Sequence, residues 1–277
     1  MKKETLSIRF LYQTHIGRAI LKILTKPFLS NTAGKFLDCR FSRWLVPLFI
    51  QKHNIDMSGF EGRKFRSFND FFTRKRTPGH IDITPGHLIS PCDGYLSIYP
   101  VSQDQIYHIK HSAYHLHDLL KSQALAQKFA GGTCLIFRLT PQNYHRYCYV
   151  CDGIRMESRA IPGKLHCVRP TAYASFPVFT ENSREYTRIR TQRYGDIIQM
   201  EIGALLVGKI SNHSQKETIF QGMEKGYFEF GGSTILLLIQ KDRLAMDQRF
   251  LSNARQGIET KVRLGEKIGT LKQTGCE

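Results

Sequence analysis

Residues 227–239 read YFEFGGSTILLLI, two apolar runs of the kind found in β-strands, separated by Gly231, Gly232, Ser233 and Thr234. Aromatic and β-branched residues favour strands on both sides of this break. A hairpin turn is the simplest interpretation, because glycine adopts positive φ without steric cost and serine is common in turns. The remaining sequence decides whether Ser233 also has a chemical role.

Length and composition indicate a globular protein that is strongly basic. The 277 residues suffice for one large domain, or for one domain with an extension. Hydrophobic residues make up 41% and charged residues 23% of the chain, which excludes a disordered protein. Its 40 Lys and Arg against 23 Asp and Glu give a net charge of +17. Such a charge predicts attraction to a polyanion, either nucleic acid or an anionic membrane surface.

The cysteines and the apolar runs bear on cellular location. The seven cysteines are scattered, without the spacing of a disulfide framework, so reduced thiols in a cytosolic setting are expected. The start MKKETLSIRFLYQ lacks the apolar core and cleavage site of a signal peptide. No apolar run is long enough to span a bilayer, so any membrane contact is expected to be peripheral.

The N-terminal part is predicted to be helical. From about residue 7 to 55 apolar residues recur at helical spacing among Lys and Arg, as in IGRAILKILTKPFL (16–29) and FSRWLVPLFIQKH (41–53). Their basic faces can rest on anionic lipid with the apolar faces in the interface, but a helix packed on the protein's own core shows the same pattern. We expect residues 1–60 to form a helical, membrane-facing segment.

From about residue 88 the pattern changes to short strands. The predicted strands are YLSIYPV, GTCLIFRLT, YTRIRTQRYG, DIIQMEIGALLVGKI and STILLLIQ, and turn signals such as PCDG, IPGK and RYGD separate them. The tail KVRLGEKIGTL adds one more strand-and-turn unit. The expected fold class is α+β, with a helical N-terminal segment followed by a β-rich domain over residues 61–277.

Several common site motifs are absent or weak. Four histidines (108, 111, 115 and 117) and the CxxC of Cys148 and Cys151 do not match the usual spacing of zinc ligands, so no metal is predicted. Neither GxGxxG nor GxxxxGK[ST] occurs. Ser233 lacks the second glycine of a GxSxG elbow and is followed by a strand instead of a helix, which disfavours an α/β-hydrolase.

Nucleophilic catalysis by a serine remains possible. The candidate residues are Asp93 in SPCDG, His145 in PQNYHRY and Ser233. The first two lie at turn-like strand ends, where functional side chains are often displayed. Serine, base and orienting acid are recognised by geometry, and their order along the chain is free. Taken singly, Asp93 is equally well a surface turn residue and His145 a half-buried histidine.

Eight blocks, taken in order, resemble the phosphatidylserine decarboxylase family. Together they cover roughly residues 65–240, and their fixed order makes the match specific. The blocks are FNDFFTRKRTPG (68–79), SPCDG (90–94), IKHSAYHLHDLL (109–120), RLTPQNYHRYCYVCDG (138–153), IPGKLHCVRP (161–170), FTENSREY (179–186), IGALLVGKI (202–210) and KGYFEFGGSTILLL (225–238).

This resemblance implies that Ser233 makes a cofactor. In the family the serine attacks the carbonyl of the preceding glycine, and elimination and hydrolysis then leave a pyruvoyl group. Here cleavage between Gly232 and Ser233 is expected to give a β chain of residues 1–232 and an α chain beginning at the former Ser233. The pyruvoyl group acts as a covalent electron sink, as pyridoxal phosphate does elsewhere. Decarboxylation of phosphatidylserine to phosphatidylethanolamine follows, with no metal and no pyridoxal phosphate.

The residue types suit this chemistry. A serine hydroxyl is a poor nucleophile at its ordinary pKa and needs a base, which His145 held by Asp93 can supply. Gly232 has no Cβ, so the hydroxyl can approach its carbonyl and the backbone can adopt a strained conformation. Gly231 adds further freedom.

One position departs from the family pattern. Well-known bacterial members read YHRxH, whereas this chain has Cys148 at the second histidine. Either His145 serves both self-cleavage and decarboxylation, which we favour, or another group such as His166 in GKLHC replaces the missing imidazole. Cys148 itself is expected to be a packed thiol.

The resemblance also implies the partners. These are phosphatidylserine, an anionic membrane surface and the paired β and α chains; a homo-oligomer is compatible with it, and no nucleic acid is expected. The enzyme is then peripheral on the cytoplasmic face of the cell membrane. Candidate phosphate contacts in the matching blocks are Lys110, Arg146, Arg184 and Lys209.

Three other functions remain open. A basic nucleic-acid-binding β-barrel explains the charge, a serine hydrolase uses Asp93, His145 and Ser233 without self-cleavage, and a lipid-binding relative has lost processing. Each of them predicts an intact chain.

Overall fold

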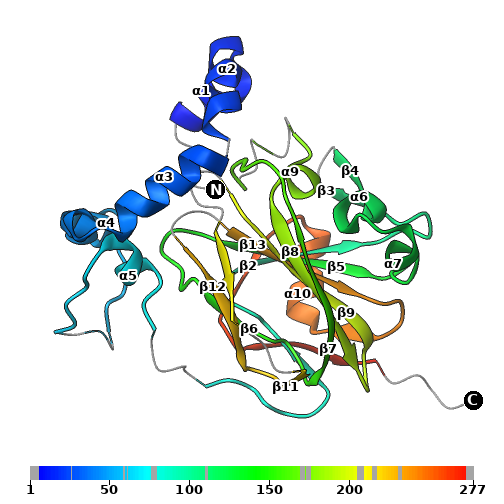
Figure 1. The fold of residues 1–277 in the computed structure, drawn as a ribbon. Helices are drawn as coiled ribbons and strands as arrows, with labels where there is room; N and C mark the ends of the chain where they lie inside the picture. Colours follow the sequence, from blue (N-terminus) through cyan, green and yellow to red (C-terminus); the bar gives the residue numbers. More distant parts are fainter. Residues whose placement is uncertain are drawn as a thin grey trace, which may run out of the picture.

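The fold consists of N-terminal helices attached to a body of sheets (Figure 1). The computed structural model describes residues 6–25, 27–58, 60, 62–75, 80–109, 112–168, 172, 176–204, 209–213, 217–229 and 233–272. Among these residues, no helix is both long and apolar enough to cross a membrane.

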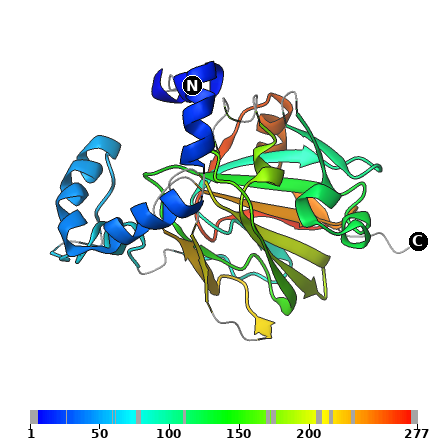
Figure 2. The same cartoon turned by 45° about the horizontal axis from the view of Figure 1, so that its top comes forward.

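The N-terminal helices confirm the helical prediction for residues 7–55. They stand out from the sheets on one side in both views (Figures 1 and 2). Thr14 starts the second helix because its hydroxyl accepts a hydrogen bond from Gly17 N, and Asn54 ends the fourth in a left-handed conformation. The elements are α1 (Leu6–Gln13), α2 (His15–Leu24), α3 (Pro27–Asp38), the 3₁₀ helix η1 (Arg40–Trp44), α4 (Leu45–His53) and α5 (Phe68–Phe72).

A small hydrophobic core joins α3, η1, α4 and α5. Phe49 of α4 meets Phe68 of α5 edge to face, with ring centroids 5.1 Å apart. Phe68 N donates a hydrogen bond to Ser42 Oγ at 2.9 Å, which fixes the start of α5 against η1. The buried members of this helical core are Leu37, Val46, Ile55, Phe65, Phe68, Phe71 and Phe72.

The body is built around an eight-stranded antiparallel sheet with STILLLI as an inner strand. All seven residues of that strand are buried. Leu236 and Leu238 pack into one core cluster, while Ile235, Leu237 and Ile239 pack into the other, because side chains alternate between the faces of a strand. In sheet order the strands are β11 (Thr218–Ile219), β7 (Gly153–Ile161), β8 (Arg184–Thr191), β9 (Gly195–Ile202), β13 (Ser233–Ile239), β5 (Thr133–Leu139), β2 (Gly94–Pro100) and β15 (Thr260–Val262).

Among the described residues, three smaller sheets and four short helices complete the body. The sheets are β10 (Ile210–Asn212), β12 (Glu224–Phe228) and β6 (Arg146–Cys148); β1 (His87–Ile89), β16 (Lys267–Leu271) and β14 (Leu244–Met246); and β3 (Ile106–Ile109) with β4 (Ser112–His115). The helices are α6 (Leu116–Leu120), α7 (Gln123–Gln127), α9 (Val178–Glu181) and α10 (Gln248–Arg255). The predicted α+β class is confirmed, and so are the strands predicted within residues 95–101, 132–140 and 233–240.

The hairpin interpretation of residues 227–239 is wrong. β12 and β13 belong to different sheets: β12 pairs with β10 and β6, whereas β13 pairs with β5 and β9. Ser233 and Thr234 are the first residues of β13 and not part of a turn. A strand that is buried on both faces needs a neighbour along each edge, and β5 and β9 already occupy both edges of β13.

A buried ion pair holds the β10–β12–β6 sheet against the large sheet. Lys225 Nζ of β12 lies 2.5 Å from Glu201 Oε2 of β9, and both side chains are 0% exposed. Asn212 of β10 accepts a hydrogen bond from Lys225 Nζ at 3.1 Å and another from the Tyr147 hydroxyl of β6 at 3.1 Å. Burial raises the pKa of Glu201, and the charge of Lys225 opposes this shift. The four side chains therefore connect four strands of two sheets.

We expect Lys225→Met to lower the free energy of unfolding by about 3–5 kcal/mol, because Glu201 then stays buried without its counter-charge. The double variant Lys225→Met with Glu201→Leu should recover most of this loss. Urea unfolding followed by circular dichroism measures both. The measurement is made in a Ser233→Ala background, because the family resemblance predicts chain cleavage at Ser233. A loss under about 1 kcal/mol for Lys225→Met would show that water or another cation satisfies Glu201.

Candidate active site at the start of the central strand

Ser233 is buried at the point where the central strand begins. It lies opposite Leu139 of β5, and its side chain is 1% exposed. Its hydroxyl has no hydrogen-bond partner in the part of the chain that the structure describes. Leaving a buried hydroxyl unsatisfied costs about 1–3 kcal/mol, so this position indicates a chemical rather than a stabilising role. Gly231 and Gly232 lie outside the described residues.

Asp93 lies at the same end of the large sheet. It precedes the first residue of β2, and Tyr95 of β2 and Thr234 of β13 both pair with Arg138 of β5. Neighbouring strands are about 4.8 Å apart, so the starts of β2 and β13 are separated by about 10 Å. Asp93 Oδ1 accepts a hydrogen bond from Leu264 N at 2.8 Å, which anchors this carboxylate.

The glycine after Asp93 is required by its close approach to β5. A Cβ added to Gly94 would lie 2.8 Å from the carbonyl oxygen of Arg138. Any other residue here would push β2 away from β5, and with it the turn that carries Asp93.

His145 is fully buried and is connected to Ser233 by two short stretches of chain. Its carbonyl oxygen accepts a hydrogen bond from Phe228 N at 3.0 Å, and only residues 229–232 separate Phe228 from Ser233. On the other side Leu139, the partner of Ser233, leads into a turn in which Thr140 N donates to Asn143 Oδ1 at 2.7 Å. Both stretches keep His145 at the end of the sheet where β13 begins.

Phe72 of α5 covers the imidazole of His145. The two ring centroids are 4.0 Å apart, with an angle of 36° between the planes. The helical core therefore reaches the candidate active site and shields this histidine from water. Sequence reasoning missed this role, because nothing in FNDFF distinguishes Phe72 from Phe68 and Phe71.

Cys148 is a buried thiol at the end of β6. Burial raises the pKa of its thiol to about 12, so the group is protonated at neutral pH and cannot serve as a base. Its backbone is fixed, since Cys148 N donates to Pro91 O at 2.9 Å and Gln199 Nε2 donates to Cys148 O at 3.0 Å.

His166 lies on the β9 side of Ser233, in contact with the N-terminal helices. Its Nε2 is 3.2 Å from Glu181 Oε2, and its ring stacks on Phe176 with centroids 4.6 Å apart. Burial lowers the pKa of His166, against the opposing effect of Glu181, so the imidazole is neutral at pH 7. Asn182 Nδ2 donates to both His166 O and Gly203 O, at 2.8 and 2.7 Å.

That bridge connects His166 to the strand beside Ser233. Gly203 directly follows Ile202, the partner of Thr234 in β13. The structure thus brings Asp93, His145 and Ser233 to one end of the large sheet. It places His166 at the same end, beyond β9.

The four candidate phosphate contacts have different surroundings. Arg184 is buried, and its guanidinium donates to the carbonyl oxygens of Leu119, Asp118, Thr180 and Asn182 at 2.7–2.9 Å. The hypothesis that Arg184 binds phosphate is therefore wrong, because the side chain is 1% exposed and four of its five N–H donors bond to the fold.

The other three candidates are partly engaged or undescribed. Arg146 lies 2.7 Å from Glu224 and also donates to Thr73 O at 2.9 Å. Lys209 lies 2.6 Å from Glu229, and the hydrogen bond to that carboxylate raises its pKa. Lys110 lies outside the described residues.

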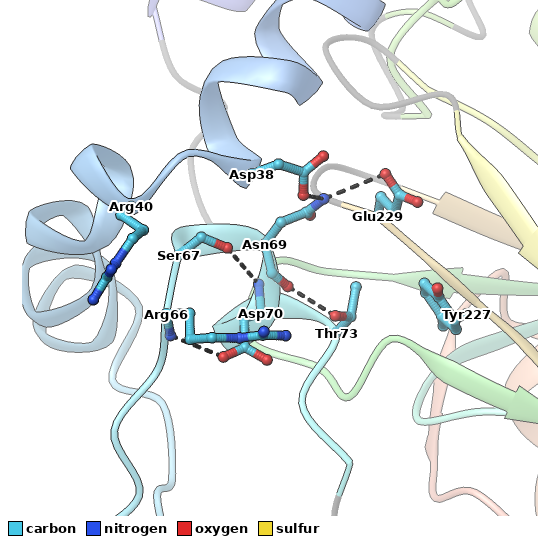
Figure 3. Close-up of a pocket in the computed structure, with 9 residues that line it drawn as sticks. All are labelled: Asp38, Arg40, Arg66, Ser67, Asn69, Asp70, Thr73, Tyr227 and Glu229. Carbon is cyan, nitrogen blue, oxygen red and sulfur yellow. Dashed lines mark hydrogen bonds between the residues drawn. The ribbon is translucent and has the colours of Figure 1, made fainter.

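A polar cavity of about 670 Å³ opens beside the strand that leads to Ser233 (Figure 3). At its centre Asn69 Nδ2 donates to Asp38 Oδ1 at 2.8 Å and to Glu229 Oε2 at 3.3 Å. It lies between the helices and β12, and its lining residues are Asp38, Arg40, Arg66, Ser67, Asn69, Asp70, Thr73, Tyr227 and Glu229. We name it the strand-side cavity.

The histidine cluster and the CxxC form no metal site in the described part of the chain. No group of three or more His, Cys, Asp or Glu there could hold a metal ion. The rings of His115 and His117 are 5.4 Å apart, His111 lies outside the described residues, and Cys151 is a buried thiol of the core.

Comparison with known proteins identifies the family. A family model described as phosphatidylserine decarboxylase matches residues 68–270. The chain is 43% identical to phosphatidylserine decarboxylase proenzyme 2 of Clostridium acetobutylicum, over 95% of this chain and 91% of the relative. It is 39% identical to phosphatidylserine decarboxylase proenzymes of Clostridium botulinum and Ruminiclostridium cellulolyticum, over 95% and 94% of this chain and 92% and 89% of those relatives. The chain belongs to the phosphatidylserine decarboxylase family.

We expect iodoacetamide to label Cys39 rapidly in the native protein and to leave Cys148 unlabelled. Cys39 is exposed, whereas the thiolate fraction of a buried thiol with a pKa of about 12 is on the order of 10⁻⁴ at pH 8. Peptide mass spectrometry measures both sites, and labelling in urea supplies the control. Rapid native labelling of Cys148 would contradict a packed thiol at this position.

Proposed function

We propose that this chain decarboxylates phosphatidylserine to phosphatidylethanolamine with a pyruvoyl group that it makes from its own Ser233. The observation that carries the proposal is the buried Ser233 hydroxyl, without a partner among the described residues, directly after the sequence Gly231-Gly232. The relatives bear the name proenzyme, which is consistent with a precursor that must be processed.

Self-processing uses only groups of this chain and one water molecule. The Ser233 hydroxyl loses its proton to a base and attacks the Gly232 carbonyl carbon. The peptide bond then breaks, and an ester joins Gly232 to Ser233 Oγ. Removal of the Ser233 Cα proton expels the Gly232 carboxylate, and hydrolysis of the resulting dehydroalanine releases ammonia. The products are a β chain of residues 1–232 and an α chain of residues 233–277 that begins with the pyruvoyl group.

We assign the base to His145 and its orientation to Asp93. Both lie at the end of the sheet where Ser233 begins, and Phe72 keeps water from the His145 ring. A dry site strengthens each electrostatic interaction in it. Cys148 is protonated at neutral pH, so His145 also becomes the candidate proton donor after loss of carbon dioxide. His166 is the second candidate, as a neutral imidazole on the opposite side of Ser233.

The surroundings of Ser233 fit the pyruvoyl group. A pyruvoyl group supplies an electron sink for the electrons left when the substrate carboxylate departs. The chain contributes a buried position for it at the head of β13, and the strand-side cavity beside Glu229 is the candidate entrance for the substrate headgroup. Asp38, Asp70 and Glu229 suit the substrate amine, and Arg40 and Arg66 suit its anionic groups.

The two chains should stay together after cleavage. The α chain contains β13, which pairs with both β5 and β9, and β15 and β16, which pair with β2 and β1 of the β chain. Separating the chains would expose the all-buried strand STILLLI and break these pairings.

Residues 1–60 are the proposed membrane-facing segment of a peripheral enzyme on the cytoplasmic face of the cell membrane. Large apolar side chains are exposed along α1, α2, α3, η1 and α4, among them Ile16, Ile20, Ile23, Phe36 and Leu48. Exposed apolar side chains on short basic helices fit the interfacial region of a bilayer.

We expect intact-mass spectrometry of the purified protein to show two fragments broken after Gly232. The smaller one should be lighter by one ammonia than a peptide that starts with serine. Both should elute together on a native sizing column and separate in denaturant. Ser233→Ala should give one full-length chain. A full-length wild-type chain would exclude the pyruvoyl mechanism for this protein and favour a serine hydrolase or a lipid-binding relative.

We expect His145→Gln to slow self-cleavage by about 10²–10⁴-fold, the usual contribution of a general base. Cys148→Ala should be processed like the wild type. A time course of chain cleavage on denaturing gels measures both variants, and circular dichroism checks that each is folded. If His166→Gln abolishes cleavage while His145→Gln does not, the base is His166 and our assignment is wrong.

A further inference from the structure

A second cavity, of about 550 Å³, opens on the outer side of the helical core and differs sharply in charge from the first. It is formed by η1, the start of α4 and residues 63–65. Its lining residues are Arg40, Phe41, Arg43, Trp44, Val46, Pro47, Arg63, Lys64 and Phe65. Four of these are cations and none is an acid, whereas the strand-side cavity, which shares Arg40, has three carboxylates and two arginines in its lining. We name it the outer cavity.

Within the part of the chain that the structure describes, the cations of the outer cavity have few acidic neighbours. Arg40, Arg43 and Lys64 are exposed and form no ion pair with any residue that the structure describes. Arg63 is 4.0 Å from Asp70 and donates to the carbonyl oxygen of Lys75 at 3.2 Å. Four positive side chains line one cavity whose lining includes no carboxylate, which favours an anion, and guanidinium groups match a phosphate geometrically.

Five of the nine residues that line the outer cavity are apolar, which distinguishes it from a simple charged surface. Val46 and Phe65 are buried beneath it as part of the helical core. At the rim Phe41 is 86% exposed and Trp44 is 61% exposed, and Leu48 lies one helical turn beyond Trp44. Aromatic side chains beside basic ones are typical of the membrane interface, where a ring enters the headgroup layer and a cation meets phosphate.

We propose that the outer cavity binds the phosphate of an anionic phospholipid in the bilayer, while Phe41, Trp44 and Leu48 enter the interface around it. This is a docking site for a lipid that is not consumed, separate from the reacting centre at Ser233. This inference extends the proposed function. It depends on that function in one respect, namely that the protein acts at the surface of a bilayer. The two cavities share Arg40, but only the strand-side cavity has carboxylates in its lining. Those carboxylates suit a headgroup that carries an amine, whereas a lipid with a phosphate and no amine fits the outer cavity.

Trp44 makes this inference directly testable, because it is the only tryptophan of the chain and lies in the cavity itself. The processed protein is titrated with vesicles of phosphatidylcholine alone and of phosphatidylcholine mixed with phosphatidylglycerol. Phosphatidylglycerol has neither amine nor carboxylate and cannot be decarboxylated. With the anionic vesicles we expect a blue shift of the Trp44 emission and quenching by lipids brominated on their acyl chains. Both effects should be far weaker with phosphatidylcholine alone.

The variants separate this site from net charge. Each cation near an anionic surface contributes about 1 kcal/mol, so Arg43→Gln with Lys64→Gln should weaken vesicle binding by about 30-fold. The matched control, Arg255→Gln with Lys261→Gln, removes two exposed charges from the body and should bind within about 3-fold of the wild type, because exposed charges beyond a Debye length are screened.

Three outcomes overturn the inference. The first is an unchanged Trp44 emission on anionic vesicles. The second is an equal loss of vesicle affinity in both double variants. The third is a change of Trp44 emission with a single-stranded oligonucleotide but not with anionic vesicles. Decarboxylation of detergent-dispersed phosphatidylserine is measured on the same samples. If the protein is cleaved and active but does not bind the vesicles, the docking site is refuted and the proposed function is not. If the chain binds the vesicles but is neither cleaved nor active, the proposed function is refuted and the docking site is not.

Discussion

The pairing of β13 on both edges is the constraint on which the rest of the structure depends. A strand between β5 and β9, buried on both faces, has its position and register fixed by its neighbours. Its first residue is therefore held in place as firmly as a core residue, although it carries a hydroxyl. The position of Ser233 is fixed, but its hydroxyl has no hydrogen-bond partner among the described residues. Such an unsatisfied buried hydroxyl is expected where the group has a chemical role.

The sheet change before Ser233 follows from the same constraint. Because β5 and β9 occupy both edges of β13, β12 has to leave the large sheet, and it finds partners in β6 and β10. The buried Lys225–Glu201 pair then joins this second sheet to the first. A chain break between Gly232 and Ser233 consequently removes no strand from its sheet, since the strands on either side of it have separate partners.

Local patterns predicted the elements well and their partners poorly. Runs such as STILLLI and the helical spacing of residues 7–55 reflect burial, which periodicity reports directly. The hairpin was predicted wrongly because two apolar runs around glycines look alike whether they pair with each other or with distant strands. The prediction for Arg184 was wrong for a related reason. The sequence does not show whether an arginine donates to backbone carbonyl oxygens inside the fold, as Arg184 does, or faces solvent. The roles of Phe72 and of both cavities depend on packing between segments far apart in sequence, and no local signal carries that information.

The helical core connects the proposed lipid-docking cavity to the proposed active site. Val46 and Phe65 line the outer cavity, Phe72 covers the ring of His145, and all three belong to the same buried cluster. Close-packed cores move as units and do not deform continuously. In our proposal, a phospholipid held in the outer cavity therefore orients the same packed unit that covers His145. Asn69 and Asp70 of α5 line the strand-side cavity as well, so in this proposal the same orientation sets how the candidate substrate entrance faces the bilayer. The proposed membrane docking and the shielding of His145, our proposed base, are then two consequences of one packing arrangement.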